Sequence, residues 1–556
     1  MKKIIVLIWF CLFSGVILIA KPTPDYSYLY KNLPFSMPKV QVPRFPKTTF
    51  SILDFGAIGD AVTLNTEAFE KAMLALNAKG GGTLQVPSGV YYTGPITFYS
   101  NINLHLQDGA VIIFSDNFSD YKLIKTSFEG LETRRCISPL NAIGATNVAI
   151  TGNGVIDGNG DAWRFVKKNK MTASQWKKLT QKGVLSADKQ LWFPTENSRK
   201  GYELSAGNFN VPQVESEEQW EEIHEWLRPV LLSFVRCKNV YLQGVTFQNS
   251  PSWNLHPNMC EHVIIDGITV RNPWYSQNGD GLDLESCTNA LVVNSKFDVG
   301  DDAICIKSGK DADGRKRAMP CQNVIIDNCM VFHGHGGFVV GSEMSGGVKN
   351  VLVSNCQFLG TDVGLRFKSV RGRGGVVEHI YMNNINMMNI ATDALLFDLY
   401  YSGKSATETL EDGDILATEE SIPLVTEETP IFRHISIKNI TCRGALRAMF
   451  FNGLPEMNIS DVVVENVSIY ATQGAELSEV DGILLKHVQV VANNEPALML
   501  NNVSNAHIDD FTCPEAEIKV LVKGVRTKRV TIHSKQILKN QVKQTKMVLT
   551  DAVDIN

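Results

Sequence analysis

The sequence lacks three features that would point to common partners or folds. It has no excess of positive charge, because 53 Lys and Arg residues face 58 Asp and Glu residues for a net charge of −5. Neither nucleic acid nor an anionic membrane surface is therefore indicated as a partner. No apolar run after residue 20 is long enough to cross a bilayer. Apart from one insert, no helix-length pattern separates the repeated segments described below, which argues against a βαβ sheet.

The N-terminus reads as an export signal. Lys2 and Lys3 precede an apolar run that ends at Ala20, and Pro22 and Pro24 follow. This order is typical of a secretory signal peptide over residues 1–20, and an uncleaved membrane anchor is the alternative. We expect a periplasmic or secreted protein with no membrane attachment after cleavage.

Ten cysteines follow the one inside the apolar run. Export would permit disulfides. However, Cys305, Cys329 and Cys356 all sit among apolar residues of short segments. We predict that most of the ten are buried small hydrophobic residues, with room for one or two disulfides.

A short pattern recurs along the chain. Each copy has a polar residue, two Val or Ile residues separated by one position, and then a polar residue that is often Asn or Gly. Copies begin at positions 147, 239, 262, 290, 323, 350, 379, 434 and 461, and the 55-residue step after 379 is one doubled interval. Alternation of this kind indicates strands, and Asn suits a repeated left-handed turn.

The repeat predicts an all-β protein, a right-handed parallel β-helix of about ten coils. A β-sandwich or a propeller is the alternative, but no blade motif of roughly 40 to 50 residues is present. One good helix follows Asn65 or Thr66, with Ala68, Ala72, Leu74 and Leu76 largely on one side, and would cap the first coil. The expected parts are an extended arm (21–48), the β-helix (49–540) with a helical insert (about 160–230) and an acidic insert (about 403–430), and a tail (541–556).

The helical insert fills the 92 residues between the copies at 147 and 239. It has two helix-like segments, and Ser216 and Gln219 of the second have capping-box spacing. Five tryptophans fall in it: Trp163, Trp176, Trp192, Trp220 and Trp226. The insert either packs its own aromatic residues or forms a wall at one end of a sugar-binding cleft.

Four successive units share a strand that ends in serine, at Ser286, Ser308, Ser342 and Ser369. Counting back from these serines gives the relative positions of six charged or titratable residues. Asp280 and Asp302 both lie six positions before their serine, and Asp301 and His335 both lie seven before. Arg366 lies three positions before Ser369 and Lys368 one before. Equal positions on adjacent coils stack about 4.8 Å apart. We therefore expect Asp280 beside Asp302, and Asp301 beside His335, on the outward face.

Such a cluster suits hydrolysis of a glycosidic bond. Neighbouring carboxylates push their pKa values apart, so one can keep a proton while others stay ionised. An inverting enzyme needs its carboxyl groups roughly 6.5–9.5 Å apart, with water between them. Arg366 and Lys368 would bind an anionic group of the substrate. A calcium site of Asp280, Asp301 and Asp302 is the chemical rival, although His335 and the two cations disfavour a hard dication.

At these residues the sequence resembles glycoside hydrolase family 28, the polygalacturonases and their relatives. The motifs read "NGDG" at 278–281, "GDD" at 300–302, "GHG" at 334–336 and "RFK" at 366–368. Their order and spacing match the family, and the resemblance covers about residues 48 to 520. Gly279 and Phe367 depart from the Thr and Ile common in the family.

The resemblance implies a role for each matching residue. Asp301 is expected to be the general acid, Asp280 and Asp302 the pair that activates water, and His335 the support for the protonation of Asp301. Arg366 and Lys368 are expected to hold a galacturonate carboxylate, with Asn278 also binding substrate. The implied reaction is inverting hydrolysis of α-1,4-galacturonosyl bonds in pectin, by a monomer without cofactor or metal.

Other functions stay open at this point. A rhamnogalacturonan or decorated-galacturonan hydrolase of the same family is the first alternative. A pectate lyase and a non-catalytic carbohydrate-binding β-helix belong to different classes. The length and aromatic content of the insert favour exo-action, because a wall across the groove would admit only a chain end; an insert folded away on the far side would leave the groove open.

Overall fold

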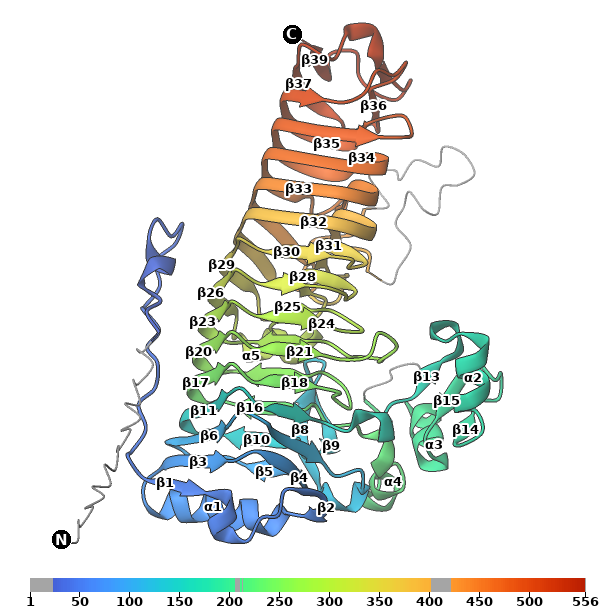
Figure 1. Ribbon diagram of the computed structural model, residues 1–556. Helices are drawn as coiled ribbons and strands as arrows, with labels where there is room; N and C mark the ends of the chain where they lie inside the picture. The colour runs from blue at the N-terminus through green and yellow to red at the C-terminus, as the bar shows by residue number, and fades with distance from the viewer. Residues whose placement is uncertain (1–23, 206–210, 213, 402–421, 556) are drawn as a thin grey trace, which may run out of the picture.

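The computed structural model describes residues 24–205, 211–212, 214–401 and 422–555. Parallel strands stack along one long axis, as in a parallel β-helix (Figure 1). The predicted fold class is confirmed. The predicted signal peptide, and most of the predicted acidic insert, lie outside the described residues.

Each coil of the lower and middle part contributes three short strands, and each strand pairs with its counterpart on the next coil. The first series is β3 (Gly82–Val86), β6 (Ile102–Leu106), β11 (Thr146–Gly152), β17 (Lys238–Gln243), β20 (Glu261–Asp266), β23 (Thr288–Val293), β26 (Cys321–Asp327) and β29 (Val348–Ser354). The second is β4 (Gly89–Thr93), β7 (Ala110–Phe114), β12 (Val155–Asp157), β18 (Thr246–Gln248), β21 (Thr269–Arg271), β24 (Lys296–Asp298), β27 (Met330–Val331) and β30 (Gln357–Leu359). The third is β5 (Ile96–Thr97), β10 (Leu140–Ile143), β16 (Leu232–Val235), β19 (Leu255–Asn258), β22 (Leu282–Glu285), β25 (Ile304–Lys307), β28 (Gly336–Gly341) and β31 (Val363–Lys368).

The upper coils are continuous through their corners. The strands there are long: β32 (Val376–Asp398), β33 (Ile431–Asn452), β34 (Ile459–Ala492) and β35 (Leu498–Thr512). Above them lie β36 (Val520–Lys523), β37 (Lys528–His533), β38 (Val542–Gln544) and β39 (Val553–Ile555). Residues 541–556 were predicted as a tail, but β38 and β39 in this segment pair with β36 and β37.

The recurring sequence pattern marks the first strand series. Val148 aligns with Val240, Val240 with Val263, and Val263 with Ala290. The asparagines at the turns have φ near +55° and donate side-chain hydrogen bonds from one coil to the next, as Asn239 does to Asn147 at 2.8 Å. Asn tolerates this left-handed conformation, so the stacked Asn turns keep adjacent coils in register. The prediction that Asn occupies a repeated left-handed turn is confirmed.

The interior of the solenoid is apolar along its length. All ten cysteines of the described residues are buried free thiols, so no disulfide is present in that part of the chain. Their interpretation as small core residues is confirmed.

Helix α1 (Thr66–Ala78) covers the first coil, as predicted (Figure 1). Ala68, Ala72 and Leu76 are buried, but Leu74 is 45% exposed, so its predicted place on the apolar side is wrong. Phe69 and Met73 take that face instead. The Asn65 side chain makes no cap to the helix; its oxygen accepts from the backbone N–H of Ile58 at 2.7 Å.

The N-terminal arm runs beside the solenoid (Figure 1). Tyr26, Leu29 and Val40 pack on outward apolar residues of the first strand series, among them Tyr241 and Ile264. The Tyr26 hydroxyl donates to Asp266 at 2.8 Å. The arm therefore covers an apolar strip on the outside of the coils.

The insert forms a separate lobe beside the coils (Figure 1). It holds a small sheet of β13 (Val166–Lys167), β14 (Val184–Leu185) and β15 (Leu191–Phe193), with helices α2 (Ala173–Leu179), α3 (Glu196–Leu204) and α4 (Glu217–Glu222). Helices α2 and α4 were predicted, and the capping box of Ser216 and Gln219 is present. Helix α3 was missed, as was α5 (Asp311–Arg317), which follows β25.

Most tryptophans of the insert build the core of the lobe. Trp163, Trp192 and Trp226 are buried, and Trp220 packs against the same cluster as Trp163 and Trp226. The rings of Trp163 and Trp226 contact other aromatic residues of the lobe or of the segment before it. For Trp163, Trp192 and Trp226 the self-packing interpretation holds, while Trp176 on α2 and Trp220 on α4 are partly exposed.

No helix in the described ranges is long and apolar enough to cross a membrane.

Candidate active site

The four strands β22, β25, β28 and β31 carry the predicted cluster on adjacent coils. Leu282 pairs with Ile304, and Ile304 with Phe338, so Asp280 stacks beside Asp302 and Asp301 beside His335. The backbone agrees, because Gly281 N–H donates to Asp302 O and His335 N–H donates to Asp301 O, both at 2.9 Å. The phase predicted from the serine alignment is confirmed.

Asp301 and His335 form a hydrogen-bonded pair. The His335 Nδ1 lies 3.0 Å from Asp301 Oδ1, which also accepts from the Asp302 N–H at 3.0 Å. The charge of Asp301 raises the pKa of His335 despite partial burial. Burial opposes ionisation of Asp301, but His335 and the more distant Lys368 and Arg366 outweigh it and lower the pKa of Asp301. In the absence of substrate, Asp301 is therefore ionised.

Asp302 is held by both cations of the predicted clamp. Arg366 Nη1 lies 3.0 Å from Asp302 Oδ1, and Lys368 Nζ lies 2.7 Å from Asp302 Oδ2. Burial disfavours the charge on Asp302, yet Lys368 and Arg366 lower its pKa overall. The ring of Tyr401, which the sequence did not single out, faces the Lys368 ammonium at 4.9 Å and the Arg366 guanidinium at 5.8 Å.

Asp280 is the acid of the three whose pKa is raised. It is only 3% exposed, and one carboxyl oxygen has no hydrogen-bond partner among the described residues. Burial raises the pKa of Asp280 well above its ordinary value, and the negative charges of Asp283 and Asp301 add to the effect. The pKa values of Asp280 and Asp301 thus shift in opposite directions, and the role of Asp301 as general acid stays a prediction.

The three acids form one compact cluster. One carboxylate oxygen from each of Asp280, Asp301 and Asp302 lies within 4.8 Å of the other two. The roughly 6.5–9.5 Å expected for an inverting enzyme separates whole carboxyl groups, so that spacing stays a prediction.

A second charged cluster adjoins the acids and was missed. Lys307 Nζ lies 2.9 Å from Glu343 and 3.4 Å from Asp283, over the ring of Trp253 at 4.2 Å. Burial raises the pKa of Asp283 to about 8, although Lys307 opposes it. The serine alignment already held the signal, since Asp283 has the phase of Arg366, and Lys307 that of Lys368.

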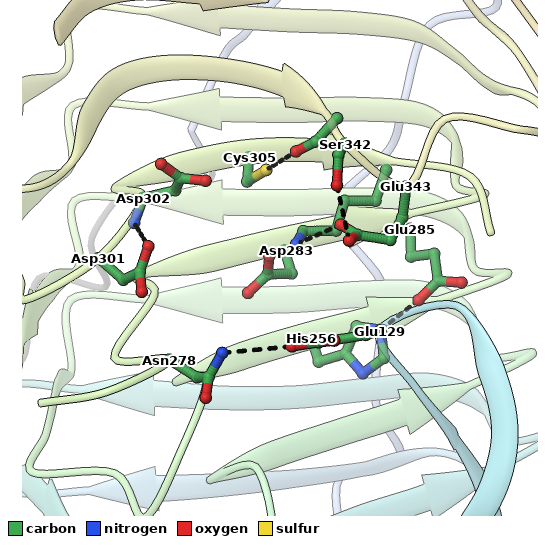
Figure 2. Close-up of polar contacts among 12 residues, drawn as sticks. Glu129, His256, Asn278, Asp283, Glu285, Asp301, Asp302, Cys305, Ser342 and Glu343 are labelled. Atoms are coloured by element: carbon green, nitrogen blue, oxygen red, sulfur yellow. Dashed lines mark hydrogen bonds and ion pairs between the residues drawn. The ribbon is translucent and has the colours of Figure 1, made fainter. Parts of the chain in front are cut away.

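Both polar atoms of the Asn278 side chain form hydrogen bonds to other side chains of the protein. Its oxygen accepts from Arg228 Nη2 at 3.0 Å, and its nitrogen donates to Glu129 Oε1 at 3.2 Å (Figure 2). Arg228 is fully buried at the end of the insert and also donates to Gln277 O at 2.9 Å. Asn278, predicted to bind substrate, thus joins the site loop to the insert and to the tip of the hairpin formed by β8 (Leu123–Phe128) and β9 (Leu131–Cys136).

The insert lies against the site. Lys170 Nζ is 3.4 Å from His335 Nε2. Arg164, also of the insert, donates to Ser250 O at 2.5 Å and to Asn249 at 2.7 Å, on the coil before the site. The alternative in which the insert folds away on the far side is therefore wrong.

These groups define a class of protein. An acidic sugar could bind between the Arg366–Lys368 pair and three carboxyl groups that differ in pKa, on the outer face of a parallel β-helix. These are the catalytic and substrate-binding groups of an enzyme that hydrolyses glycosidic bonds in an anionic polysaccharide.

Comparison with known proteins identifies the family. Residues 219–416 match the model "Glycosyl hydrolases family 28". The chain is 32% identical to a hyperthermoactive exopolygalacturonase from Thermotoga maritima, with a TM-score of 0.63 over 81% of this chain and 92% of that one. It is also 26% identical to a probable polygalacturonase of Vitis vinifera over 78% of this chain and 77% of that protein. The chain belongs to glycoside hydrolase family 28 and is polygalacturonase-like.

Two further relatives are informative. The exo-poly-alpha-D-galacturonosidase of Dickeya chrysanthemi is 31% identical over 64% of this chain and 58% of that protein. The family 28 exopolygalacturonase of Yersinia enterocolitica has a TM-score of 0.61 at 20% identity, over 91% of this chain and 79% of that one, which shows the shared fold. Family membership makes this chain a pectin-degrading hydrolase, and the family implies galacturonan as the substrate.

The Asp301–His335 pair predicts a pH-dependent contribution to stability. Because the folded-state pKa of His335 is raised, the pair stabilises the fold below the ordinary His pKa of about 6.5 and loses this contribution as pH rises through the raised value. We expect the Tm difference between wild type and His335→Asn to shrink as pH rises above about 6.5. Thermal unfolding of both, with His333→Asn on the same coil as control, checks this; a constant difference would contradict it.

Proposed function

We propose that the protein is an exo-acting polygalacturonase, which releases galacturonic acid or a short fixed unit from a chain end. The main support for this proposal is the position of the insert beside the active site. Lys170 contacts His335, and Arg228 donates a hydrogen bond to Asn278. The hairpin tip of β8 and β9 joins the same loop through Glu129. A groove bounded in this way favours a chain terminus over mid-chain binding, and the names of the Thermotoga and Dickeya relatives support the same reading.

The ionisation of the site suggests how substrate prepares the acid. A galacturonate carboxylate bound to Arg366 and Lys368 would offset the positive charge that lowers the pKa of Asp301. The raised pKa of Asp280 favours its protonated form, and one of its carboxyl oxygens lies within 4.8 Å of one of Asp301. Transfer of this proton would leave Asp301 as general acid and Asp280, with Asp302, as the group that activates water.

The mode of cleavage is tested on polygalacturonate by following viscosity against new reducing ends. Exo-action should produce reducing ends from the start with little fall in viscosity, and a single short product. A steep early fall in viscosity with few new ends would contradict exo-action. Parallel assays on rhamnogalacturonan oligomers test the alternative substrate. Faster release of sugar products from these oligomers than from polygalacturonate would make rhamnogalacturonan the substrate.

We also propose that hydrolysis inverts the anomeric carbon, as the resemblance implies. Support comes from Asp302, which is a poor nucleophile while Arg366 and Lys368 both bind it. Proton NMR of the first turnovers should show the β-anomer appearing before mutarotation. An initial α-anomer would mean retention, with one of the three acids forming a glycosyl intermediate.

A further inference from the structure

One surface of the insert is strongly basic, against the sign of the whole chain. Residues 162–187 contain seven Lys and Arg residues and no Asp or Glu, in a protein of net charge −5. The six lysines of this segment are here called the basic lobe surface: Lys167, Lys168, Lys170, Lys177, Lys178 and Lys182. Four of the six are exposed, and Lys167 and Lys170 are partly exposed.

These lysines are not neutralised by acids of the protein. None of the six forms an ion pair within the described ranges, although residues 215–225 of the same insert hold six glutamates. Of these glutamates, Glu217 pairs with Arg134, and Glu222 with Lys200. Charges of opposite sign are therefore separated on the lobe, which an ordinary solvated surface would not require.

The basic lobe surface is continuous with the active site. Lys170 ends a short 3₁₀ turn (Lys168–Lys170) and reaches His335 at 3.4 Å. Helix α2 begins three residues later, and its last turn carries Lys177 and Lys178. Trp176 precedes them and remains partly exposed, unlike the buried tryptophans of the lobe core. Lys170 thus links this lysine-rich segment to the reaction centre, and Trp176 adds a partly exposed aromatic ring to the segment.

We propose that the basic lobe surface is a binding site for the polyanionic chain outside the catalytic pocket, which retains galacturonan between cleavage events. A row of carboxylates along the polymer matches a row of unpaired ammonium groups, and neither needs a bound metal. The proposal rests on the proposed polygalacturonase function and extends it to recognition of the remote part of the polymer. It does not depend on exo-action.

The test compares two triple variants that remove the same charge. Lys177→Gln/Lys178→Gln/Lys182→Gln alters the lobe, and Lys535→Gln/Lys539→Gln/Lys543→Gln alters exposed lysines at the far end of the solenoid. The readout is the ratio of kcat/KM on polygalacturonate to kcat/KM on digalacturonate. At about 10 mM salt, where the screening length is roughly 30 Å, we expect the lobe variant to lower this ratio about 10-fold and the control to leave it unchanged.

Salt dependence and product patterns distinguish a failure of the proposed binding site from a failure of the proposed exo-action. The deficit of the lobe variant should shrink towards about 150 mM salt, where screening acts within roughly 8 Å. A ratio equal to that of the control at low salt would overturn the binding site, even if single-unit products confirm exo-action. Endo-type products with a reduced ratio would overturn exo-action and support the binding site. Migration of both variants in gels containing polygalacturonate gives an independent measure, in which only the lobe variant should lose retardation.

Discussion

Asp301→Asn should lower kcat on polygalacturonate by at least about 100-fold, because general acid catalysis contributes roughly 10²–10⁴. Asp301 touches His335 and the Asp302 N–H and takes no part in the apolar core, so the fold should persist. An aryl galacturonide whose phenol leaves without protonation should lose much less activity. Steady-state kinetics with circular dichroism measures all three outcomes.

A matched control is available on the same coil. Asp298→Asn removes one carboxylate from β24, paired only with the exposed His333 in the described chain. It should retain nearly full activity. If Asp301→Asn kept more than a tenth of wild-type kcat, or lost the same factor on the activated aryl substrate, Asp301 would not be the acid.

Lys368→Met should reduce kcat/KM on galacturonan by about 100-fold or more. Removal of one partner from a buried charge pair costs roughly 2–5 kcal/mol, and Lys368 is 6% exposed against Asp302. The variant would also lose the ammonium that we expect to bind a galacturonate carboxylate. The loss should be much smaller on methyl-esterified oligomers, which lack that charge.

The control for this change is Lys438→Met, which removes the same charge from the partly exposed pair with Glu465. Its kinetics should match wild type. The ratio of losses on acidic and esterified substrates is independent of any general effect on the fold, which Tm reports separately. Equal losses on both substrates would argue against carboxylate binding by Lys368.

The repeat explains why so much of the site could be predicted. In a stack of parallel coils, equal phase in the sequence means adjacency in space, so Asp280 and Asp302, or Asp301 and His335, could be paired from the four serines alone. The same rule placed Arg366 and Lys368 on one strand face. It would also have placed Asp283 and Lys307, had their phase been followed.

What lay outside the repeat could not be predicted. Lys170, Arg228 and Glu129 come from segments with no counterpart on neighbouring coils, so no register relates them to His335 or Asn278. The distance between carboxyl groups depends on side-chain rotamers and on the ion pairs of Asp302, which the order of residues does not specify. The burial that raises the pKa of Asp280 is likewise not specified by the alternation of strand residues.

The N-terminal arm changes how this solenoid holds together. In a stack of coils each unit touches only its neighbours, and stability accumulates step by step along the axis. The arm departs from this rule: Tyr26 bonds Asp266 on β20, and the ring of Phe35 lies 6.1 Å from that of Tyr381 on β32. A segment that precedes the first coil is thereby fastened to coils formed by residues synthesised much later. The arm can dock only after the intervening coils have formed. Its contacts therefore couple the folding of those coils to one another. Detachment of the arm would expose apolar residues on several coils at once.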